Sequence, residues 1–241
     1  FDWNNPEHKA HPFFDENGNP TRDIRLYETL VVNGDKYKGR NAEVYRGGRE
    51  GYGAGAAEDQ KFRYGYGFRK FIRDKKNEMN KKPYSCPLIR MPELFLYMAE
   101  AMNQLGQASV KDEFGMDAYD YLNIVHERAG LPAVVAAEVP AGEVLLEYLL
   151  DERAREFGQE DIRHHDMRRY RKGAEWATRP VEELVTTLVH ENKSDYHKSE
   201  FNYQINVRSE KYLWYDHWYL LPFPVSEINK KYGLIQNPGW E

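Results

Sequence analysis

Two carboxylates, Glu152 and Glu156, are the residues whose types and spacing come closest to a chemical site. They continue the helical row of Leu145 and Leu149, so one helix would carry both acids on its apolar stripe. A carboxylate turned toward a core is costly unless hydrogen bonds and an opposite charge meet it, and arginine supplies both. Arginines follow just downstream in the chain. We therefore expect a structural ion-pair network made of Glu152, Glu156, Arg163, Asp166 and Arg169.

Paired carboxylates can also hydrolyse glycosidic bonds, one as a general acid and the other as a base or nucleophile. That chemistry needs an open cleft and one carboxyl group that stays protonated. The row shared with leucines argues against the cleft, and the nearby arginines favour the ionised form of both acids. We expect no catalytic residue and no enzymatic activity.

The composition excludes several other classes of function. The 241 residues are 41% apolar and 30% charged, which suits one large domain or two small ones, and no run of 18 apolar residues could span a membrane. A net charge of -5 disfavours nucleic acid as a partner. The single cysteine, Cys86, excludes an internal disulfide and a thiolate zinc cluster. No histidine has a partner at metal-ligand spacing, so we expect no metal and no cofactor.

Residues 40–71 are rich in glycine and aromatic side chains. The glycines match neither a P-loop nor a dinucleotide fingerprint, because no Gly-Lys-Ser/Thr follows and no apolar strand precedes them. Residues 65–71 approach an RNA-recognition pattern, but Tyr64 stands where that pattern has a basic residue. The alternation in residues 65–71 predicts a strand.

Two apolar stripes predict a helical hairpin over residues 91–130. The first stripe consists of Leu94, Met98, Ala101, Met102 and Leu105. The second stripe consists of Ala118, Tyr121, Leu122, Val125 and Ala129. Pro92 suits the first turn of the first helix, and Gly130 ends the second. Two helices joined in this way form one tetratricopeptide-like hairpin, which needs stacked neighbours to bury both of its faces.

Three segments, in this order, resemble the SusD/RagB family of outer-membrane glycan-binding lipoproteins. The first, residues 87–132, contains PLIRMPELFLYMAEAMNQLG and AYDYLNIVHERAGLP, with His126 where the family usually has arginine. The second, residues 150–169, contains LDERAREFGQEDIRHHDMRR, with His164 and His165 at usually aromatic positions. The third, residues 214–240, ends in QNPGW. The chain is similar to the C-terminal half of a family member.

The resemblance implies a mainly α fold, the C-terminal portion of a SusD-like α/α superhelix. Such a portion has tetratricopeptide-like helical hairpins, long irregular loops and a few short strands. We expect residues 1–85 to form a loop-rich region with short strands and the candidate ligand surface. Residues 86–241 would then form the helical region that contains the 91–130 hairpin. We also expect the complete protein to carry a lipid anchor on a preceding N-terminal part.

The resemblance further implies non-catalytic binding of oligosaccharide or polysaccharide at the cell surface and delivery to a TonB-dependent, SusC-like outer-membrane transporter. Sugars present apolar C–H faces and hydroxyl rims, so aromatic rings with polar neighbours make a suitable site. The loop-borne candidates for ligand binding are Trp3, Tyr45, Tyr52 and Tyr64. The alternative is a tetratricopeptide-like adaptor whose groove binds a protein and no sugar.

Overall fold

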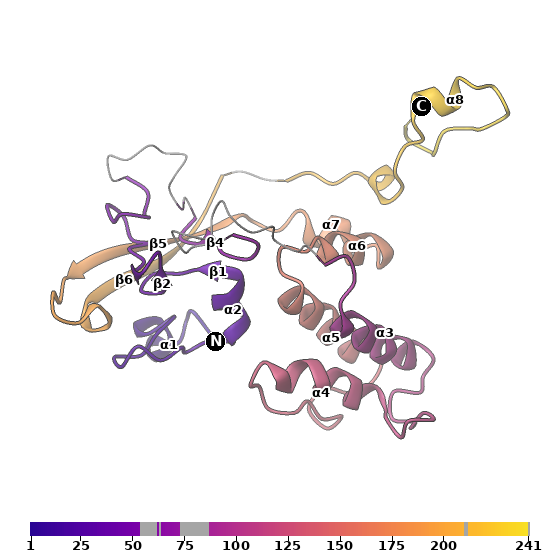
Figure 1. Cartoon of the computed structure of the whole chain (residues 1–241). Coiled ribbons are helices and arrows are strands. Elements are labelled where there is room, and N and C mark those ends of the chain that lie inside the picture. The colour runs from indigo at the N-terminus through magenta and orange to yellow at the C-terminus, as the bar shows by residue number, and fades with distance from the viewer. Residues whose placement is uncertain (54–61, 63, 73–86, 210–211, 241) are drawn as a thin grey trace.

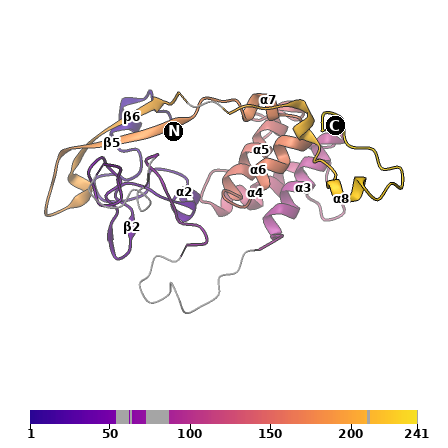
Figure 2. The ribbon, with the colours of Figure 1, turned by 90° about the horizontal axis from the view of Figure 1, so that it is seen from above.

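The computed structural model of the protein describes residues 1–53, 62, 64–72, 87–209 and 212–240. Within these ranges, helices gather in residues 91–176, and short strands lie in residues 1–72 (Figure 1). Seen from above, the N-terminal elements and a long β-hairpin lie at one end of the molecule, with the helices at the other (Figure 2). Cys86 lies outside the described residues.

The helical part begins with α3 (Met91–Gln104) and α4 (Ala118–Arg128), which pack on each other. Pro92 lies in the first turn of α3, where its missing N–H leaves no hydrogen bond unmade. Asp117 caps α4 by accepting hydrogen bonds from the backbone N–H groups of Tyr119 and Asp120, and the Asp120 side chain completes a capping box. Local chemistry thus sets the start of each helix.

Helix α5 (Glu143–Glu156) packs against both members of this hairpin and closes the main core. The core combines the inner faces of the three helices, including the buried residues Leu96, Ala99, Leu122, Val125, Leu145 and Leu149. Helices α6 (Ile162–Arg169) and α7 (Gly173–Trp176) follow, and α6 packs on α5. The second predicted stripe is buried as expected, since Ala118, Tyr121, Leu122, Val125 and Ala129 all lie inside.

The first predicted stripe, on α3, is wrong by part of a turn. Leu94 is 47% exposed, whereas Leu96 is 0% exposed and faces the core. The buried face of α3 also carries Glu93 and Glu100, whose carboxylates are hydrogen-bonded to other side chains. The search for apolar periodicity misses such a face, because it assigns every carboxylate to the solvent-exposed side of the helix.

The N-terminal part consists of short elements. Helices α1 (Pro6–Ala10) and α2 (Ile24–Thr29) precede two small antiparallel pairs. In one pair β1 (Leu30–Val31) lies beside β4 (Gly67–Phe68), and in the other β2 (Lys36–Tyr37) lies beside β3 (Arg40–Asn41). Strand β4 falls inside the strand predicted over residues 65–71, but it is only two residues long.

A long hairpin follows the helices, although we expected residues 86–241 to be helical. Strands β5 (Glu182–His190) and β6 (Glu200–Val207) pair antiparallel, joined through the 3₁₀ turn η2 (Tyr196–Lys198). The β-branched Val and Thr residues of β5 favour the extended form there. Leu184 and Tyr203 pack with Phe13, Tyr27 and Val32, so the hairpin completes the N-terminal core. The division of the chain near residue 85 stays a prediction.

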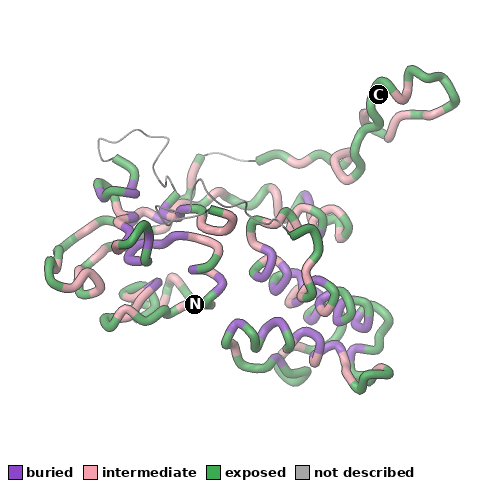
Figure 3. Tube along the Cα trace, viewed as in Figure 1, coloured by how far each residue is buried: buried purple, intermediate pink, exposed green. Residues whose placement is uncertain are grey.

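The C-terminal segment, residues 212–240, extends away from this body (Figures 1 and 3). It contains the 3₁₀ turn η3 (Asp216–Tyr219) and the short helix α8 (Val225–Ile228), and none of its residues is buried. Its contact with the helices centres on Trp214, whose ring lies against Gly173. The Tyr219 hydroxyl also donates a hydrogen bond to the carbonyl oxygen of Arg171 at 2.8 Å.

The position of the α3 core face predicts opposite effects for two leucines two residues apart. We expect Leu96→Ala to lower the free energy of unfolding by about 2–5 kcal/mol, because it leaves a cavity in the helical core. The matched control, Leu94→Ala, should change that free energy by less than about 0.5 kcal/mol. Urea denaturation of both variants measures this, and equal losses would contradict the placement of α3.

Candidate functional site

Arg25 of α2 joins the N-terminal part to helix α5 through two fully or nearly fully buried carboxylates. Its guanidinium Nη1 lies 2.7 Å from Oε1 of Glu152 and 3.3 Å from Oε2 of Glu156. The other face of the Glu152 carboxylate contacts Nδ1 of His126 at 3.0 Å. His126 lies on α4 and stands at the position where the resemblance described above would place an arginine.

Glu156 is also surrounded by guanidinium groups. Arg90, just before α3, donates from Nη1 to Oε1 at 2.9 Å. Arg128, the last residue of α4, donates from Nη2 to the two carboxylate oxygens at 2.7 and 2.6 Å. Three arginines from three elements thus converge on one carboxylate. This arrangement fixes the relative positions of α2, α4 and α5. A small pocket of about 200 Å³ reaches Glu156, but the same three arginines line it and occupy the carboxylate.

A second set of ion pairs joins α6 to helices α5 and α3. Asp166 is fully buried and accepts hydrogen bonds at 2.9 Å from Nε of Arg153 and at 2.9 Å from Nε of Arg169. Arg169 also donates through both terminal nitrogens to Glu100 of α3. Arg163, which we expected in the same network, contacts neither Glu152 nor Glu156. Its guanidinium stacks 3.5 Å from the Trp176 ring centre and donates to the carbonyl oxygen of Leu150.

Three of the four aromatic residues predicted to bind ligand, Tyr45, Tyr52 and Tyr64, line one pocket of about 300 Å³. Tyr52 and Tyr64 are 47% and 48% exposed, and Tyr45 is half-buried. The opposite wall is formed by β5 and β6, through Glu183, Leu184, Val185, Thr186, Asn206 and Arg208. We call this the tyrosine pocket.

Close backbone contacts bring the tyrosine-bearing loops to the hairpin. The N–H of Leu184 donates to the carbonyl oxygen of Tyr64 at 3.2 Å. Gly65 follows at a φ of 82°, and a Cβ there would lie 2.3 Å from the carbonyl oxygen of Leu184. At Gly51 a Cβ would lie 1.7 Å from the carbonyl oxygen of Tyr45. Glycine is required at both positions, because a side chain at position 65 would push the Tyr64 segment off β5 and one at position 51 would clash with the backbone of Tyr45.

Glu50 holds the loop that carries Tyr45 and Tyr52. Its carboxylate accepts a hydrogen bond from Nη1 of Arg40 at 3.0 Å and another from the backbone N–H of Glu43 at 3.0 Å. Burial raises the pKa of Glu50, but the hydrogen bonds from Arg40 and the Glu43 N–H outweigh it, so the pKa is lowered overall. A charged Glu50 therefore stabilises the loop at neutral pH.

Polar groups surround the rings of the tyrosine pocket. The Arg208 guanidinium lies 5.3 Å from the Tyr64 ring centre and donates to Glu183 at 2.7 Å. The side chain of Asn206 lines the same wall and can donate and accept hydrogen bonds. Burial, followed by the charges of Glu43 and Glu191, raises the pKa of Tyr45, so its hydroxyl stays protonated. The pocket thus offers ring faces, donors and acceptors, the groups that a sugar requires.

Trp3, the fourth predicted residue, does not line the tyrosine pocket. It is partly buried against the N-terminal core, 6.5 Å from the Phe13 ring centre and 4.9 Å from that of Phe1. Its ring therefore anchors the N-terminal loop to the body of the protein.

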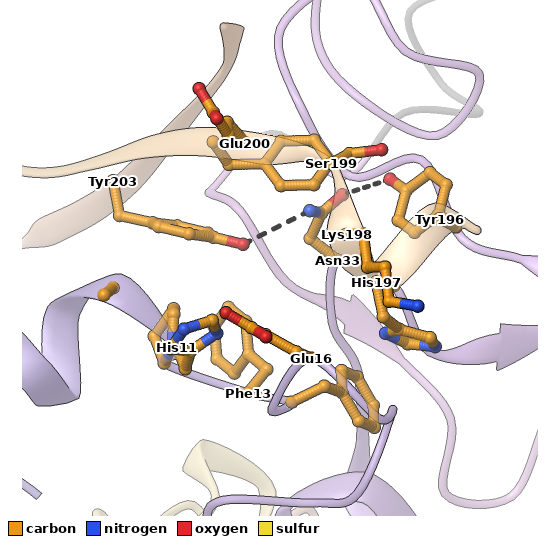
Figure 4. A pocket seen from close by; sticks show the side chains of 15 residues that line it. His11, Phe13, Glu16, Asn33, Tyr196, His197, Lys198, Ser199, Glu200 and Tyr203 are labelled. Carbon is orange, nitrogen blue, oxygen red and sulfur yellow. Dashed lines mark hydrogen bonds between the residues drawn. The ribbon is translucent and has the colours of Figure 1, made fainter. Parts of the chain in front are cut away.

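A second pocket of about 500 Å³ lies between the N-terminal loops and the turn η2 (Figure 4). Three of its polar groups bond to one another: the Tyr196 hydroxyl donates to Asn33 at 2.9 Å, and Asn33 donates to the Tyr203 hydroxyl at 3.4 Å. The rings of Phe13 and Tyr203 are buried in the core below. These two rings are therefore less suited to stacking a sugar than the half-exposed Tyr52 and Tyr64.

The sequence interpretation missed the hairpin wall of the tyrosine pocket. Glu183 of β5 and Asn206 of β6 are opposite each other in the register, and Arg208 directly follows β6. The β-branched residues Val185, Thr186, Thr187 and Val189 were the available signal for a strand. Among the described residues, no group of three or more His, Cys, Asp or Glu side chains is arranged to hold a metal ion.

The comparisons with known proteins identify the family. A profile of the SusD family matches residues 4–240. The chain belongs to the SusD family. None of the helices in the described part of this SusD-family chain combines the length and hydropathy of a bilayer-spanning segment. No curated protein shows significant sequence similarity to it.

Solved structures share the fold. A SusD-like protein from Bacteroides fragilis matches with a TM-score of 0.63 and 25% identity, over 91% of this chain and 39% of its own. The protein BT4246 matches with a TM-score of 0.68 and 25% identity, over 92% of this chain and 37% of its own. A SusD-like carbohydrate binding protein from B. fragilis is 21% identical, with a TM-score of 0.56, over 95% and 44%. The chain thus spans about two fifths of the length of these relatives.

The convergence of Arg25 on two buried acids predicts a large effect of its removal. We expect Arg25→Ala to lower the free energy of unfolding by about 3–5 kcal/mol, because Glu152 loses its strongest buried partner. Arg155 contacts the same carboxylate at 3.6 Å but is 47% exposed, so Arg155→Ala should cost at most about 1 kcal/mol. Chemical denaturation of both variants measures the difference. Equal costs would show that Arg25 does not dock the N-terminal part.

The Glu100 ion pair predicts a loss of stability in acid. Burial raises the pKa of Glu100, but hydrogen bonds from Arg169 and Tyr170 outweigh it, so the folded-state pKa lies below the usual value of 4.5. The stabilisation is therefore complete well above pH 4.5 and is lost as the pH falls through the lower folded value. We expect Glu100→Gln to flatten the dependence of the melting temperature on pH below about 5. An unchanged pH dependence in that variant would contradict this assignment.

Proposed function

We propose that this SusD-family protein binds oligosaccharide or polysaccharide in the tyrosine pocket without transforming it. The observation that carries the proposal is the convergence of Tyr45, Tyr52 and Tyr64 on one pocket beside Asn206 and Arg208. Tyr45 and Tyr52 come from one loop and Tyr64 from the segment just before β4, and Tyr52 and Tyr64 leave about half of their surface open to solvent. An apolar sugar face can stack on such a ring while the hydroxyl rim meets the polar wall.

Family membership supports the class of ligand. The relative from B. fragilis with a TM-score of 0.56 is described as a SusD-like carbohydrate binding protein. We extend that description to this chain because the tyrosine pocket supplies a suitable surface. We further propose that the complete protein is attached to the bacterial outer membrane by a lipid anchor, is exposed at the surface and delivers glycan to a TonB-dependent, SusC-like transporter. The tetratricopeptide-like superhelix of the complete protein belongs to the same proposal.

The absence of catalysis is part of the proposal. Glu152 and Glu156, the pair with the spacing of a hydrolytic site, are 0% and 4% exposed. Their oxygens accept hydrogen bonds from arginines on α2, before α3 and on α4. A glycosidic oxygen would have to displace these arginines to reach either acid, so we assign the pair a structural role.

A protein-binding adaptor is the second candidate, and one observation favours it. The outer face of α3 carries the exposed apolar residues Leu94, Met98 and Leu105. An apolar stripe of this kind on a helical hairpin can receive an amphipathic partner helix. Affinity capture from membrane extracts tests the alternative: a cytosolic partner without a transporter would favour the adaptor, whereas a TonB-dependent transporter would favour glycan delivery.

The composition of the tyrosine pocket predicts which substitutions weaken saccharide binding. Titration calorimetry against a panel of neutral oligosaccharides should identify a ligand, and Tyr64→Ala should weaken its binding by about tenfold or more, because the stacking face is lost. Tyr64→Phe should retain most of the affinity, since the ring remains. Tyr52→Ala should act in the same direction as Tyr64→Ala.

The matched control is Tyr232→Ala, because Tyr232 is 61% exposed but lies in the C-terminal segment. This variant should bind the ligand as the unmodified protein does. A ligand bound equally well by the Tyr64→Ala and Tyr232→Ala variants would place the binding site elsewhere. If no saccharide in the panel is bound by the complete protein, the proposed function is wrong.

A further inference from the structure

A third cleft, of about 1040 Å³, lies between the end of α6 and the C-terminal segment. One wall comes from α6 and the turn after it, and the other from η3 and residues Pro238 and Gly239. Both walls are far along the chain from the tyrosine pocket, and the cleft shares no residue with it. The lining residues that matter here are His165, Arg168, Arg171, Tyr215, Asp216 and His217.

The cleft holds more positive than negative charge. Arg169 also lines it, but the carboxylates of Glu100 and Asp166 neutralise that guanidinium. Arg168 and Arg171 have no carboxylate partner in the part of the chain that the structure describes. Asp216 is the single acidic residue of the lining. Two guanidinium groups therefore face the cleft without compensation.

Arg168 gives the more specific observation. Its Nε atom is buried and makes no hydrogen bond to any described residue. A buried N–H without an acceptor is destabilising, more so on a charged group, unless a ligand supplies one. Arg171 adopts the left-handed backbone at a φ of 52°, and its guanidinium lies 5.1 Å from the Tyr219 ring centre. An anion in the cleft would therefore pair with the terminal guanidinium nitrogens of the two arginines, which no carboxylate of the described residues occupies.

The opposite wall presents aromatic rings. The rings of Tyr215 and His217 are stacked, with centres 5.7 Å apart and planes 15° apart. Tyr215 is half-exposed, and Trp240 supports His217 from the side at 4.6 Å. A ring-shaped ligand can stack on this surface while its charged substituent reaches the arginines.

We propose that this cleft binds an anionic saccharide, a sugar that carries a carboxylate or a sulfate group. The anion pairs with Arg168 and Arg171, and the sugar ring stacks on Tyr215. Arginine suits this task because its planar fork can donate two parallel hydrogen bonds to either group. The inference goes beyond the tyrosine pocket and rests on the proposed glycan binding only for the class of ligand.

Calorimetric titration of the intact protein tests the proposal with three probes. These are a galacturonic acid tetrasaccharide, its neutral form with reduced carboxyl groups, and a carrageenan tetrasaccharide that carries sulfate alone. We expect an acidic probe to bind at least tenfold more tightly than the neutral one in 50 mM NaCl, and to lose most of that preference in 500 mM NaCl. The acidic probe that binds more tightly identifies the preferred anion.

Variants locate the anion. Arg168→Ala and Arg171→Ala should each weaken binding of the acidic probe by about tenfold, since each removes a charge-assisted contact. The matched control, Lys193→Ala, removes an exposed positive charge from the turn of the β5–β6 hairpin and should leave affinity unchanged. Arg171 is exposed, so its variant remains informative if Arg168→Ala disturbs folding.

Two results would overturn the proposal: no preference for an acidic probe, or equal affinities for the Arg171→Ala and Lys193→Ala variants. The same titrations with Tyr64→Ala separate it from the proposed function. That substitution should weaken the neutral ligand of the tyrosine pocket and leave binding of the acidic probe unchanged. A loss of acidic binding in Tyr64→Ala would place the anion in the tyrosine pocket and contradict the second site.

Discussion

The burial of two carboxylates on one turn of α5 is the constraint on which the rest of the structure depends. Glu152 and Glu156 continue a row of leucines on α5, so both are buried in the core. Such burial is stable only if positively charged side chains pair with the two carboxylates. Arg25 contacts both acids at once, and it comes from the loop-rich N-terminal part. The cost of burying the acids is thus offset by docking one part of the chain on the other. Each carboxylate is paired with side chains from more than one element, so the ion pairs fix how these elements pack together.

This docking positions the candidate site. Arg25 lies on α2, which leads directly into β1 and so to the strand pair with β4. Tyr64 lies just before β4 and is hydrogen-bonded through its backbone to β5. The tyrosine pocket is therefore built on elements that are fixed in turn by the buried ion pairs. A binding site on irregular loops needs such support, because the loops have little regular hydrogen bonding of their own.

The sequence predicted the features that depend on local spacing and missed those that depend on tertiary partners. The stripe on α4 was correct because its buried face is mostly apolar. On α3 the same method failed, because two carboxylates are buried: Glu93 accepts a hydrogen bond from Tyr97 one turn on, and Glu100 pairs with Arg169 far along the chain. The partners of Glu152 and Glu156 come mainly from residues before the acids, which spacing on one helix cannot reveal. Tyr45, Tyr52 and Tyr64 were named one by one; their shared pocket required the β5–β6 hairpin, which lay in a region expected to be helical.

A crystal structure of the complete protein with a bound neutral oligosaccharide tests the central claim most directly. Our account predicts density for a sugar ring stacked on Tyr52 or Tyr64, with hydroxyl groups within hydrogen-bond distance of Asn206 or Arg208. Density at this place would establish the tyrosine pocket as the glycan site. An oligosaccharide bound elsewhere on the protein, with the three tyrosines free, would contradict the account.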